Sequence, residues 1–256
     1  MRRATKKSSK KAGVFLLALI LIALVLFFIF KHKTAVAPAT TSTPIVTSSQ
    51  SISITEVPIS EKYYSGSRPI IAGSGALADA ARKYLDTEIA NFAQEANDNV
   101  PLALQQPDVD PASAQYTIDI KGEYKKGDKY SSIILNEYLY TGGANGASTY
   151  KVFTADNATG TIISLQDIIA PSQQANFLAY VKQKLLAYQP ADDDSDNSEP
   201  VVFKDSVDKL TFSSLTDWSI DDSNLTLYFD QYAVAPGAIG AIALDLPQIE
   251  IVKFLK

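Results

Sequence analysis

The segment YTIDIKGEYKKGDKYSSIILNEYLY, residues 116–140, decides the fold class of this chain. Residues 116–124 and 130–140 have the composition of strands, and Lys125-Lys126-Gly127-Asp128 between them is a turn signal. Strands joined by so short a connection pair in antiparallel fashion. The segment therefore predicts an antiparallel hairpin, and further strands and helices are expected on both sides of it.

Strand patterns continue before and after this hairpin. Residues 54–64 predict a strand with Pro58 at an edge or bulge, and residues 67–73 predict a turn. Later in the chain, the expected strands are residues 150–155 paired with 160–165, residues 218–220 paired with 225–229, and a last strand at residues 241–246.

Two main helices are expected between these strands. The first covers residues 77–96, where an apolar stripe recurs at spacings of three and four: Leu77, Ala81, Leu85, Ile89, Phe92 and Ala96. The second follows Pro171, and its buried stripe is Phe177, Val181, Leu185 and Tyr188. Ser164 and Asp167 form a capping-box pattern ahead of it. A short closing helix after Pro247 is expected to turn Ile249, Val252 and Leu255 inward.

These elements predict an α+β body with a largely antiparallel sheet and two main helices, preceded by one N-terminal transmembrane helix. The expected divisions are a basic stub at residues 1–11, the transmembrane helix at 12–30, a Ser/Thr/Pro linker at 31–53, a small α+β subdomain at 54–114 and a C-terminal α+β domain at 115–256.

The expected membrane anchor begins at Ala12 and ends at Phe30, in a run of residues without charge or proline. A helix of this length spans ~30 Å, the hydrocarbon thickness of a bilayer. Basic residues crowd its amino-terminal side, which places the amino terminus in the cytoplasm and the body outside the cell membrane. A cleaved secretory signal is the alternative, because Ala35-Val36-Ala37 has the form of a cleavage site.

The net charge is divided unevenly along the chain. Residues 1–33 hold eight of the 23 Lys and Arg residues and no acid, so the remaining 15 stand against 28 acidic residues, a formal charge of −13. Such a body repels nucleic acid, so none is expected as a partner. It could attract a cationic partner, or the charge could serve solubility alone.

Several kinds of site are excluded by composition. The chain has no Cys, and its only His is His32, which is expected at the membrane edge. Ser-His-Asp catalysis, Cys-His catalysis and His-based zinc sites are therefore excluded from the body. Carboxylate pairs are plentiful, but their spacing selects none, so no catalytic residue, cofactor or metal is expected.

Two loops deserve separate interpretation. Asp192, Asp194 and Asp196 have the spacing of a calcium loop, yet the following glycine is missing and Phe203 stands where a bidentate acid belongs, so we expect a solvated acidic loop. In the loop TGGANG, residues 141–146, the glycines are expected to permit positive φ. A rigid recognition loop that exposes Asn145 is the functional alternative.

Around this loop the sequence resembles a known family. The run YLYTGGANGASTYKVFTADNATGTIISLQDII resembles the extracytoplasmic domain of RsiV-type anti-sigma factors, which also occurs in PdaC-type peptidoglycan deacetylases. The matching positions are Tyr140 to Gly146 with Asn145 in place of the usual His, Thr159-Gly160, Leu165 and Asp167, and then Phe229, Tyr232, Ala235 and Gly240. Residues 54–96 are similar to the smaller domain that precedes it in the family.

The resemblance implies an α+β binding or sensing body outside the membrane. In RsiV-type proteins this body is a receptor for lysozyme and restrains a cytoplasmic sigma-binding segment. About a dozen residues precede the expected anchor here, too few for such a segment, and no deacetylase domain or its metal-binding His residues follow. Anti-sigma and deacetylase activities are therefore not expected.

We accordingly expect a membrane-anchored, non-catalytic extracytoplasmic module that binds cell-wall material or a cationic wall-active protein such as lysozyme. A cell-wall glycan enzyme that uses Asp or Glu, or a structural envelope assembly protein, are the alternatives. The candidate ligand-binding residues are Tyr140, Gly142, Gly143, Asn145 and Tyr232. The deciding question is whether Tyr140, Asn145, Tyr232 and Trp218 surround one cleft.

Overall fold

The structure, a computed structural model, describes residues 51–190 and 201–256. The expected stub, the expected anchor at residues 12–30, most of the linker and the acidic loop Asp192–Asp196 lie outside the described residues. Within the described ranges, every helix is too short or too polar to cross a bilayer.

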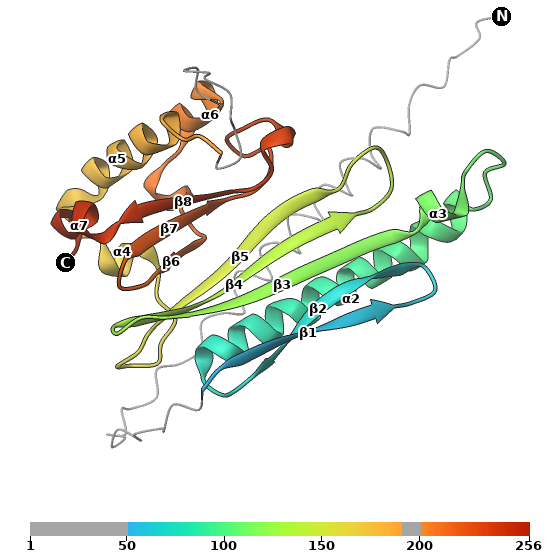
Figure 1. Cartoon of the computed structure of the whole chain (residues 1–256), viewed down its shortest axis with the longest axis horizontal. Helices are drawn as coiled ribbons and strands as arrows, with labels where there is room; N and C mark the ends of the chain where they lie inside the picture. Colours follow the sequence, from blue (N-terminus) through green and yellow to red (C-terminus); the bar gives the residue numbers. More distant parts are fainter. Residues whose placement is uncertain (1–50, 191–200) are drawn as a thin grey trace, which may run out of the picture. The chain divides into compact units, whose positions relative to one another are not determined.

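The first half of the described chain forms a five-stranded sheet in the order β1-β2-β3-β4-β5 (Figure 1). Its strands are β1 (Ser53–Ser60), β2 (Tyr64–Ala72), β3 (Tyr116–Lys126), β4 (Tyr130–Tyr140) and β5 (Ala147–Asp156). The β3–β4 hairpin confirms the prediction for residues 116–140, and three of the four neighbouring pairs are antiparallel. Only β2 and β3 run parallel, because the helix α2 (Ala76–Ala103) provides the crossover that parallel strands require.

The amino-terminal prediction was wrong in its detail. Residues 54–64 form no single strand: β1 ends at Ser60, and a turn closed by the Glu61 N–H to the Tyr64 carbonyl at 2.9 Å leads into β2. The expected turn at residues 67–73 is mostly strand. Pro69 is tolerated there because β2 pairs with β3 only at residues 64–67. Pro58 lies in the edge strand β1, as expected. The expected boundary at residues 114 and 115 falls between β2 and β3, which pair directly.

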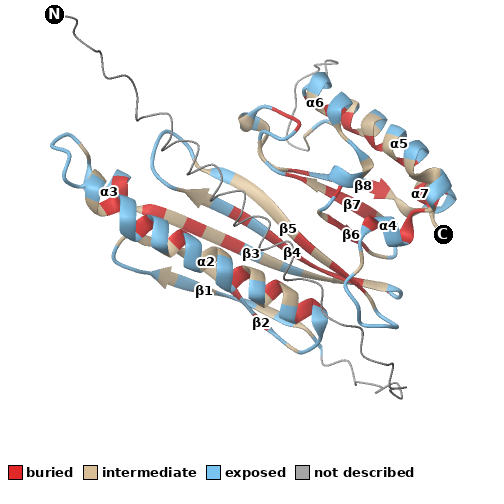
Figure 2. Cartoon of the chain, turned by 180° about the vertical axis from the view of Figure 1, so that it is seen from behind, coloured by how far each residue is buried: buried red, intermediate tan, exposed pale blue. Residues whose placement is uncertain are grey.

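Helix α2 covers one face of this sheet (Figure 2). The predicted stripe is buried, apart from Ile89, which is partly buried. The helix extends beyond the predicted end at residue 96 because Val100 continues the buried stripe by one more turn. Pro101 lies in the last turn, where it removes one hydrogen bond to the preceding turn, and the helix ends two residues later at Ala103. The short helix α3 (Pro111–Ala114) leads into β3.

The second half of the described chain has its own three-stranded sheet, in the order β6-β7-β8. The strands are β6 (Trp218–Ile220), β7 (Asn224–Phe229) and β8 (Ile242–Pro247), and β6 and β7 form the predicted hairpin. The helices and 3-10 turns are α4 (Leu165–Ile168), η1 (Pro171–Gln173), α5 (Gln174–Leu186), α6 (Lys204–Lys209), η2 (Phe212–Ser214), η3 (Gly237–Ile239), α7 (Gln248–Ile251) and η4 (Val252–Phe254).

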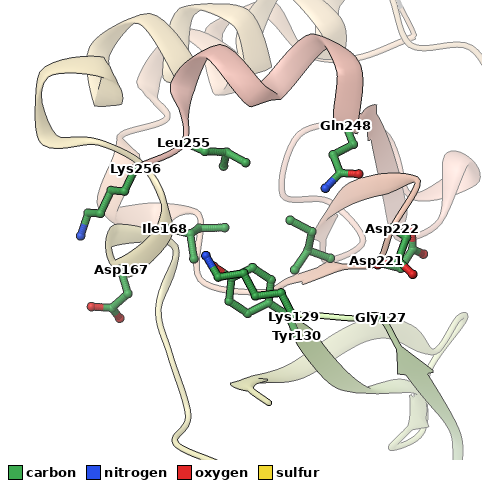
Figure 3. A pocket seen from close by; sticks show the side chains of 11 residues that line it. Gly127, Lys129, Tyr130, Asp167, Ile168, Asp221, Asp222, Gln248, Leu255 and Lys256 are labelled. Carbon is green, nitrogen blue, oxygen red and sulfur yellow. The ribbon is translucent and has the colours of Figure 1, made fainter. Parts of the chain in front are cut away.

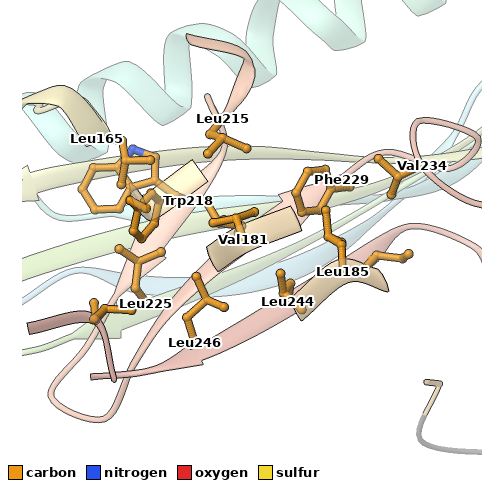
Figure 4. Close-up of a cluster of buried hydrophobic side chains, with 14 of the residues drawn as sticks. Leu165, Val181, Leu185, Leu215, Trp218, Leu225, Phe229, Val234, Leu244 and Leu246 are labelled. Carbon is orange, nitrogen blue, oxygen red and sulfur yellow. The ribbon is translucent and has the colours of Figure 1, made fainter. Parts of the chain in front are cut away.

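Each sheet has a hydrophobic core of its own. Helix α5 packs Phe177, Val181 and Leu185 onto β6–β8 as predicted, and Trp218 lies in the same cluster (Figure 4). Tyr188 is partly buried and lies beyond the end of α5. The capping box is also confirmed, since the Ser164 N–H donates to Asp167 Oδ2 at 2.7 Å.

Two carboxyl-terminal predictions were wrong. Ile249 is 86% exposed and Val252 60% exposed, whereas Ile251 and Phe254 are buried. The ring of Phe254 packs against that of Phe177 with their centroids 5.6 Å apart, and this contact sets the rotation of the closing helix.

Residues 160–165 also form no full strand. They contribute a single bridge from Ile162 to Ala155, because side chains of Asp217, Asp230 and Gln231 occupy the rest of this edge of β5.

Candidate ligand-binding groove

The free edge of β5 is covered by side chains that belong to the second half of the chain. The N–H groups of Ser148, Tyr150 and Val152 point outward at every second residue. They donate to Gln231 Oε1 at 2.8 Å, Asp230 Oδ1 at 2.9 Å and Asp217 Oδ1 at 2.9 Å. Asp217 also pairs with Lys151 at 3.0 Å. Covering an edge in this way blocks its pairing with another strand. It also holds β6–β8 beside the five-stranded sheet.

A groove of about 360 Å³ lies between the two sheets. Its position follows from the alternation of β4: Ile133 and Leu135 belong to the core under α2, whereas Ile134 and Asn136 line the groove on the other face. The lining residues are Lys121, Gly122, Glu123 and Lys125 of β3, Ile134 and Asn136 of β4, Tyr150 of β5, Thr226 and Tyr228 of β7, and Ala243 and Asp245 of β8.

Two tyrosines form the aromatic part of the groove. The ring centroids of Tyr150 and Tyr228 are 4.8 Å apart, at an interplanar angle of 51°. The Tyr228 hydroxyl bonds with Ser219 Oγ at 2.9 Å, which fixes the ring from behind. Burial raises the pKa of Tyr150, and the neighbouring Tyr228 raises it further. The Tyr150 hydroxyl therefore stays protonated at neutral pH and can both donate and accept a hydrogen bond.

Charged side chains of both signs flank these rings. Lys121, Glu123 and Lys125 alternate along one face of β3 at a spacing of roughly 7 Å, the repeat of every second residue in a strand. On the opposite wall, Asp245 accepts a hydrogen bond from the Thr226 hydroxyl at 2.6 Å. The arrangement offers donors, acceptors and ring faces to an elongated polar ligand.

The predicted Gly-rich loop lies at one end of the β4–β5 hairpin. Gly142 and Gly143 have φ of 88° and 105°, which confirms the conformational role expected of them. For Gly146 the expectation was wrong: its φ is not positive, and its missing side chain instead leaves room for the Tyr138 ring. The Tyr140 hydroxyl lies 3.0 Å from the Gly143 carbonyl and 3.2 Å from the Ser113 carbonyl, so these two acceptors share its one proton. Tyr140 thus fixes the loop, and Asn145 is exposed on it. By strand alternation, Tyr140 and the exposed Tyr138 share the face of β4 on which Asn136 lines the groove.

Tyr232 is 57% exposed and has φ of 69°, a left-handed conformation that is strained for a tyrosine. Its ring lies against Gly237, where an added Cβ would stand 2.3 Å from a ring carbon. The adjacent Gln231 bonds to Ser148 through both its main-chain N–H and its side chain. Tyr232 therefore lies near the β5 end of the Gly-rich loop. Trp218 is 3% exposed and belongs to the core, so it is part of no cleft with Tyr140 and Tyr232.

A buried carboxyl group lies behind this face. Glu137 of β4 is 1% exposed, and its Oε2 accepts hydrogen bonds from the hydroxyls of Tyr84 at 3.1 Å and Thr149 at 3.3 Å. Burial, and next the Glu88 carboxylate, raise the pKa of Glu137 to about 7. Sequence patterns did not single out Glu137 as a candidate residue. The signal was a charged residue at an inward position of β4, in phase with Ile133 and Leu135.

A smaller pocket of about 130 Å³ lies near the β3–β4 turn, with Asp167 and Lys256 on one side and Asp221 and Asp222 on the other (Figure 3). Its carboxylates already serve local structure. Asp222 Oδ1 accepts from the Asp128 N–H, and Asp221 Oδ1 accepts from two N–H groups of its own turn. The inter-sheet groove has freer polar groups and more volume, so it is the better candidate site.

Comparison with known proteins links this architecture to a domain family. Residues 166–248, which span most of the second half, match the family described as "Protein of unknown function (DUF3298)". Over these residues the chain is similar to that family. Four residues that line the groove lie inside the matched segment: Thr226 and Tyr228 of β7, and Ala243 and Asp245 of β8.

Two solved DUF3298 structures share the fold. A protein from Bacteroides fragilis NCTC 9343 has a TM-score of 0.51 and 13% identity, and covers 80% of this chain and 94% of its own. One from Pseudomonas aeruginosa PAO1 has a TM-score of 0.53 and 18% identity, with 80% and 93% covered. At these identities the likeness concerns the fold alone.

A curated relative is similar over much of the chain. The peptidoglycan-N-acetylmuramic acid deacetylase PdaC of Bacillus subtilis (strain 168) is 26% identical over 183 residues, which cover 69% of this chain and 36% of the relative. The chain thus spans about a third of that protein's length. The likeness agrees with the PdaC-type part of the sequence resemblance. The expectations drawn from RsiV-type proteins, including lysozyme binding, stay predictions.

Proposed function

We propose that this chain is an extracytoplasmic recognition module that binds cell-wall material in the groove between its two sheets. The observation that carries the proposal is the pair of tyrosines Tyr150 and Tyr228, whose ring centroids are 4.8 Å apart. The pair lies between a row of alternating charges on β3 and Asp245 on β8. The groove is open, polar and aromatic at once.

Peptidoglycan has matching chemistry. It combines sugar rings, whose C–H faces pack on aromatic rings, with short peptides that carry carboxylate and ammonium groups. Tyrosine suits such a ligand because it provides a flat apolar face and a hydroxyl at low entropic cost. Lys121 and Glu123 could pair with the charges of the peptides, and Asn136 offers an amide to either part.

The similarity to PdaC supports the same choice of ligand class, since that protein is named as a deacetylase of peptidoglycan. The proposal takes from this relative only the ligand class and not the deacetylation. It keeps the expected membrane anchor at residues 12–30, which would hold the groove close to the wall.

A sedimentation assay with the full chain in mild detergent tests the proposal. Purified peptidoglycan is the probe, and the fraction of chain that co-sediments is measured. The double variant Lys121→Ala/Glu123→Ala should lower retention about tenfold if each contact contributes near 0.7 kcal/mol. Lys83→Ala/Glu95→Ala, an exposed pair on α2, is the charge-matched control and should bind as the wild type does.

Absence of retention, or equal loss in both double variants, would refute the groove as the site.

The excess of acidic residues favours a second candidate ligand, a cationic wall-active protein. Retention of lysozyme in place of peptidoglycan, weakened by added salt, tests this candidate. Glu123 and Asp245 are two carboxylates that line the same groove, which is the pair that a glycan-cleaving enzyme would need. The enzyme alternative is therefore tested in the same assay. Release of reducing ends that Glu123→Gln or Asp245→Asn abolishes would support catalysis instead.

A further inference from the structure

Glu137 is a buried acid with an incomplete hydrogen-bond shell. Both hydroxyl donors, from Tyr84 and Thr149, reach Oε2, and Oε1 has no partner among the described residues. An ionised carboxylate needs donors on both oxygens, so a buried charge here would leave one oxygen bare. Protonation removes the charge that burial penalises, so the neutral carboxyl costs less here than the carboxylate.

The charges around Glu137 are mostly of the same sign. From α2, Tyr84 and Glu88 face it, and from the segments that cover the β5 edge, Asp230 faces it. Asp217 lies close enough to influence Tyr84, but it is paired with Lys151 of β5. No residue of the described ranges forms a salt bridge with Glu137. A negative charge on Glu137 would therefore be repelled, and only the hydrogen bonds from the Tyr84 and Thr149 hydroxyls, which lower its pKa, would oppose that repulsion.

The position of Glu137 connects it to the groove. It lies between Asn136 and Tyr138 on β4, and its partner Thr149 lies between Ser148 and Tyr150 on β5. Glu137 and Thr149 are directly opposite each other in the ladder, with their side chains toward α2. Asn136 and Tyr150 are opposite each other one step along, and they line the groove on the other face. The same backbone thus carries the buried carboxyl on one side and the proposed ligand contacts on the other.

We propose that Glu137 is a proton-binding positioning residue for the groove. With its proton bound, the carboxyl holds Tyr84 of α2 and Thr149 of β5 together, and the β4–β5 ladder presents Asn136 and Tyr150 in register. When the proton is lost, the repelled and partly unsatisfied carboxylate loosens α2 from this ladder and weakens ligand retention. The part of this inference that concerns the ligand rests on the proposed function, whereas the loosening of the ladder does not.

The pH range of the effect follows from the site. Because burial raises the pKa of Glu137 to about 7, the carboxyl is half ionised near pH 7 and almost fully ionised by about pH 8.5. Ligand retention should therefore fall between pH 6 and 8.5.

Hydrogen exchange tests the inference without a ligand. Amide exchange of residues 136–150 in the full chain is measured at pH 5.5, 7 and 8.5 and corrected for the intrinsic rate at each pH. Wild type should lose about tenfold in protection over this range, and Glu137→Gln, which cannot ionise, should stay flat. Glu95→Gln, an exposed residue of α2, is the matched control and should behave as wild type. Equal pH dependence in wild type and Glu137→Gln would overturn the inference.

Two further measurements complete the test. The carboxyl ¹³C shift of Glu137 in the wild-type chain should titrate near neutral pH, and titration near the ordinary value for glutamate would refute the proposal even if the Gln variant failed to fold. Peptidoglycan retention should fall with pH in wild type and not in Glu137→Gln. If neither protein retains peptidoglycan at any pH, the proposed function fails, while exchange and the ¹³C titration still decide the role of Glu137.

Discussion

The carboxylate of Asp217 accepts a hydrogen bond from the Val152 N–H at 2.9 Å, although 65 residues separate them in sequence. Asp217 lies just before β6, and Val152 lies on the free edge of β5. With Asp230 and Gln231, Asp217 takes the place of a neighbouring strand. The contact ties the two halves of the described chain together, so the groove between the sheets depends on it.

Removing this contact should destabilise the protein. In Asp217→Ala the Val152 N–H loses its acceptor and Lys151 its counter-ion, which should lower the free energy of unfolding by about 2 kcal/mol. Asp217→Asn keeps an acceptor oxygen and should cost less. Urea unfolding measures both, with the exposed Asp205→Ala on α6 as control. A loss in Asp205→Ala equal to that in Asp217→Ala would contradict the assignment.

The tyrosine pair should contribute to both binding and stability. Tyr228→Leu keeps apolar bulk but removes the ring that packs on Tyr150 and the hydroxyl that bonds Ser219. We expect about 1 kcal/mol lower stability and about tenfold weaker retention of peptidoglycan. Tyr63→Leu, a tyrosine of the β1–β2 turn outside the groove, should leave retention unchanged. Unchanged retention in Tyr228→Leu would argue against ring packing in ligand binding.

Stability should depend on pH through Glu137. The ordinary glutamate pKa of 4.5 describes the unfolded chain, and burial raises the pKa of Glu137 to about 7 in the folded chain. Between these values the folded state binds more protons, so the free energy of unfolding falls as pH rises and levels off above the folded-state value. The contribution is at most about 3 kcal/mol. Denaturation at pH 5 and pH 8 should show Glu137→Gln gaining on the wild type at the higher pH, and a constant difference would exclude the effect.

Gly237 should tolerate no side chain while Tyr232 is present. An added Cβ would stand 2.3 Å from the Tyr232 ring, so Gly237→Ala should lower stability by about 1–3 kcal/mol. In the Tyr232→Ala background the space is open and the same change should cost less. A double-mutant cycle by urea denaturation measures this coupling. Additive effects would show that the ring and the glycine do not constrain each other.

The expected anchor can be tested in the full chain. Leu21→Lys/Leu24→Lys places two charges in the middle of the apolar run, at a cost of roughly 3 kcal/mol each for insertion into a bilayer. The wild-type chain should stay in the membrane fraction after a carbonate wash, and the variant should be released. Replacing Ser48 and Ser49 by lysine in the linker is the charge-matched control. Release of the wild type would favour the cleaved-signal alternative.

Local patterns predicted the elements that depend on nearby residues. The β3–β4 hairpin, the β6–β7 hairpin, the stripe of α2 and the Ser164–Asp167 capping box all form as expected, because each is specified within a few residues of sequence. The positive φ of Gly142 and Gly143 was predicted for the same reason. The predictions were wrong where a distant contact decides, as at the closing helix, whose rotation is set by Phe254 against Phe177.

The candidate site shows the same division. Sequence alone indicated Tyr140, Gly142, Gly143, Asn145 and Tyr232, and the structure places them around one end of the β4–β5 hairpin. Trp218, equally conspicuous in sequence, lies in the core. Tyr150 and Tyr228 were not singled out, because an aromatic residue in a strand fits either a core or a surface face. Only packing between the sheets makes them the wall of a groove.

The sequence by itself determined the α+β class, the pairing of adjacent strands and the sites available to chemistry, since these follow from spacing, turn residues and the absence of Cys. The tertiary structure decided which polar strand face meets water and which meets α2. Alternation assigns Glu137 and Asn136 to opposite faces, but only α2 buries Glu137, and only β6–β8 turn the face of Asn136 into a groove. Burial is a property of contacts between distant segments, and no local pattern contains it.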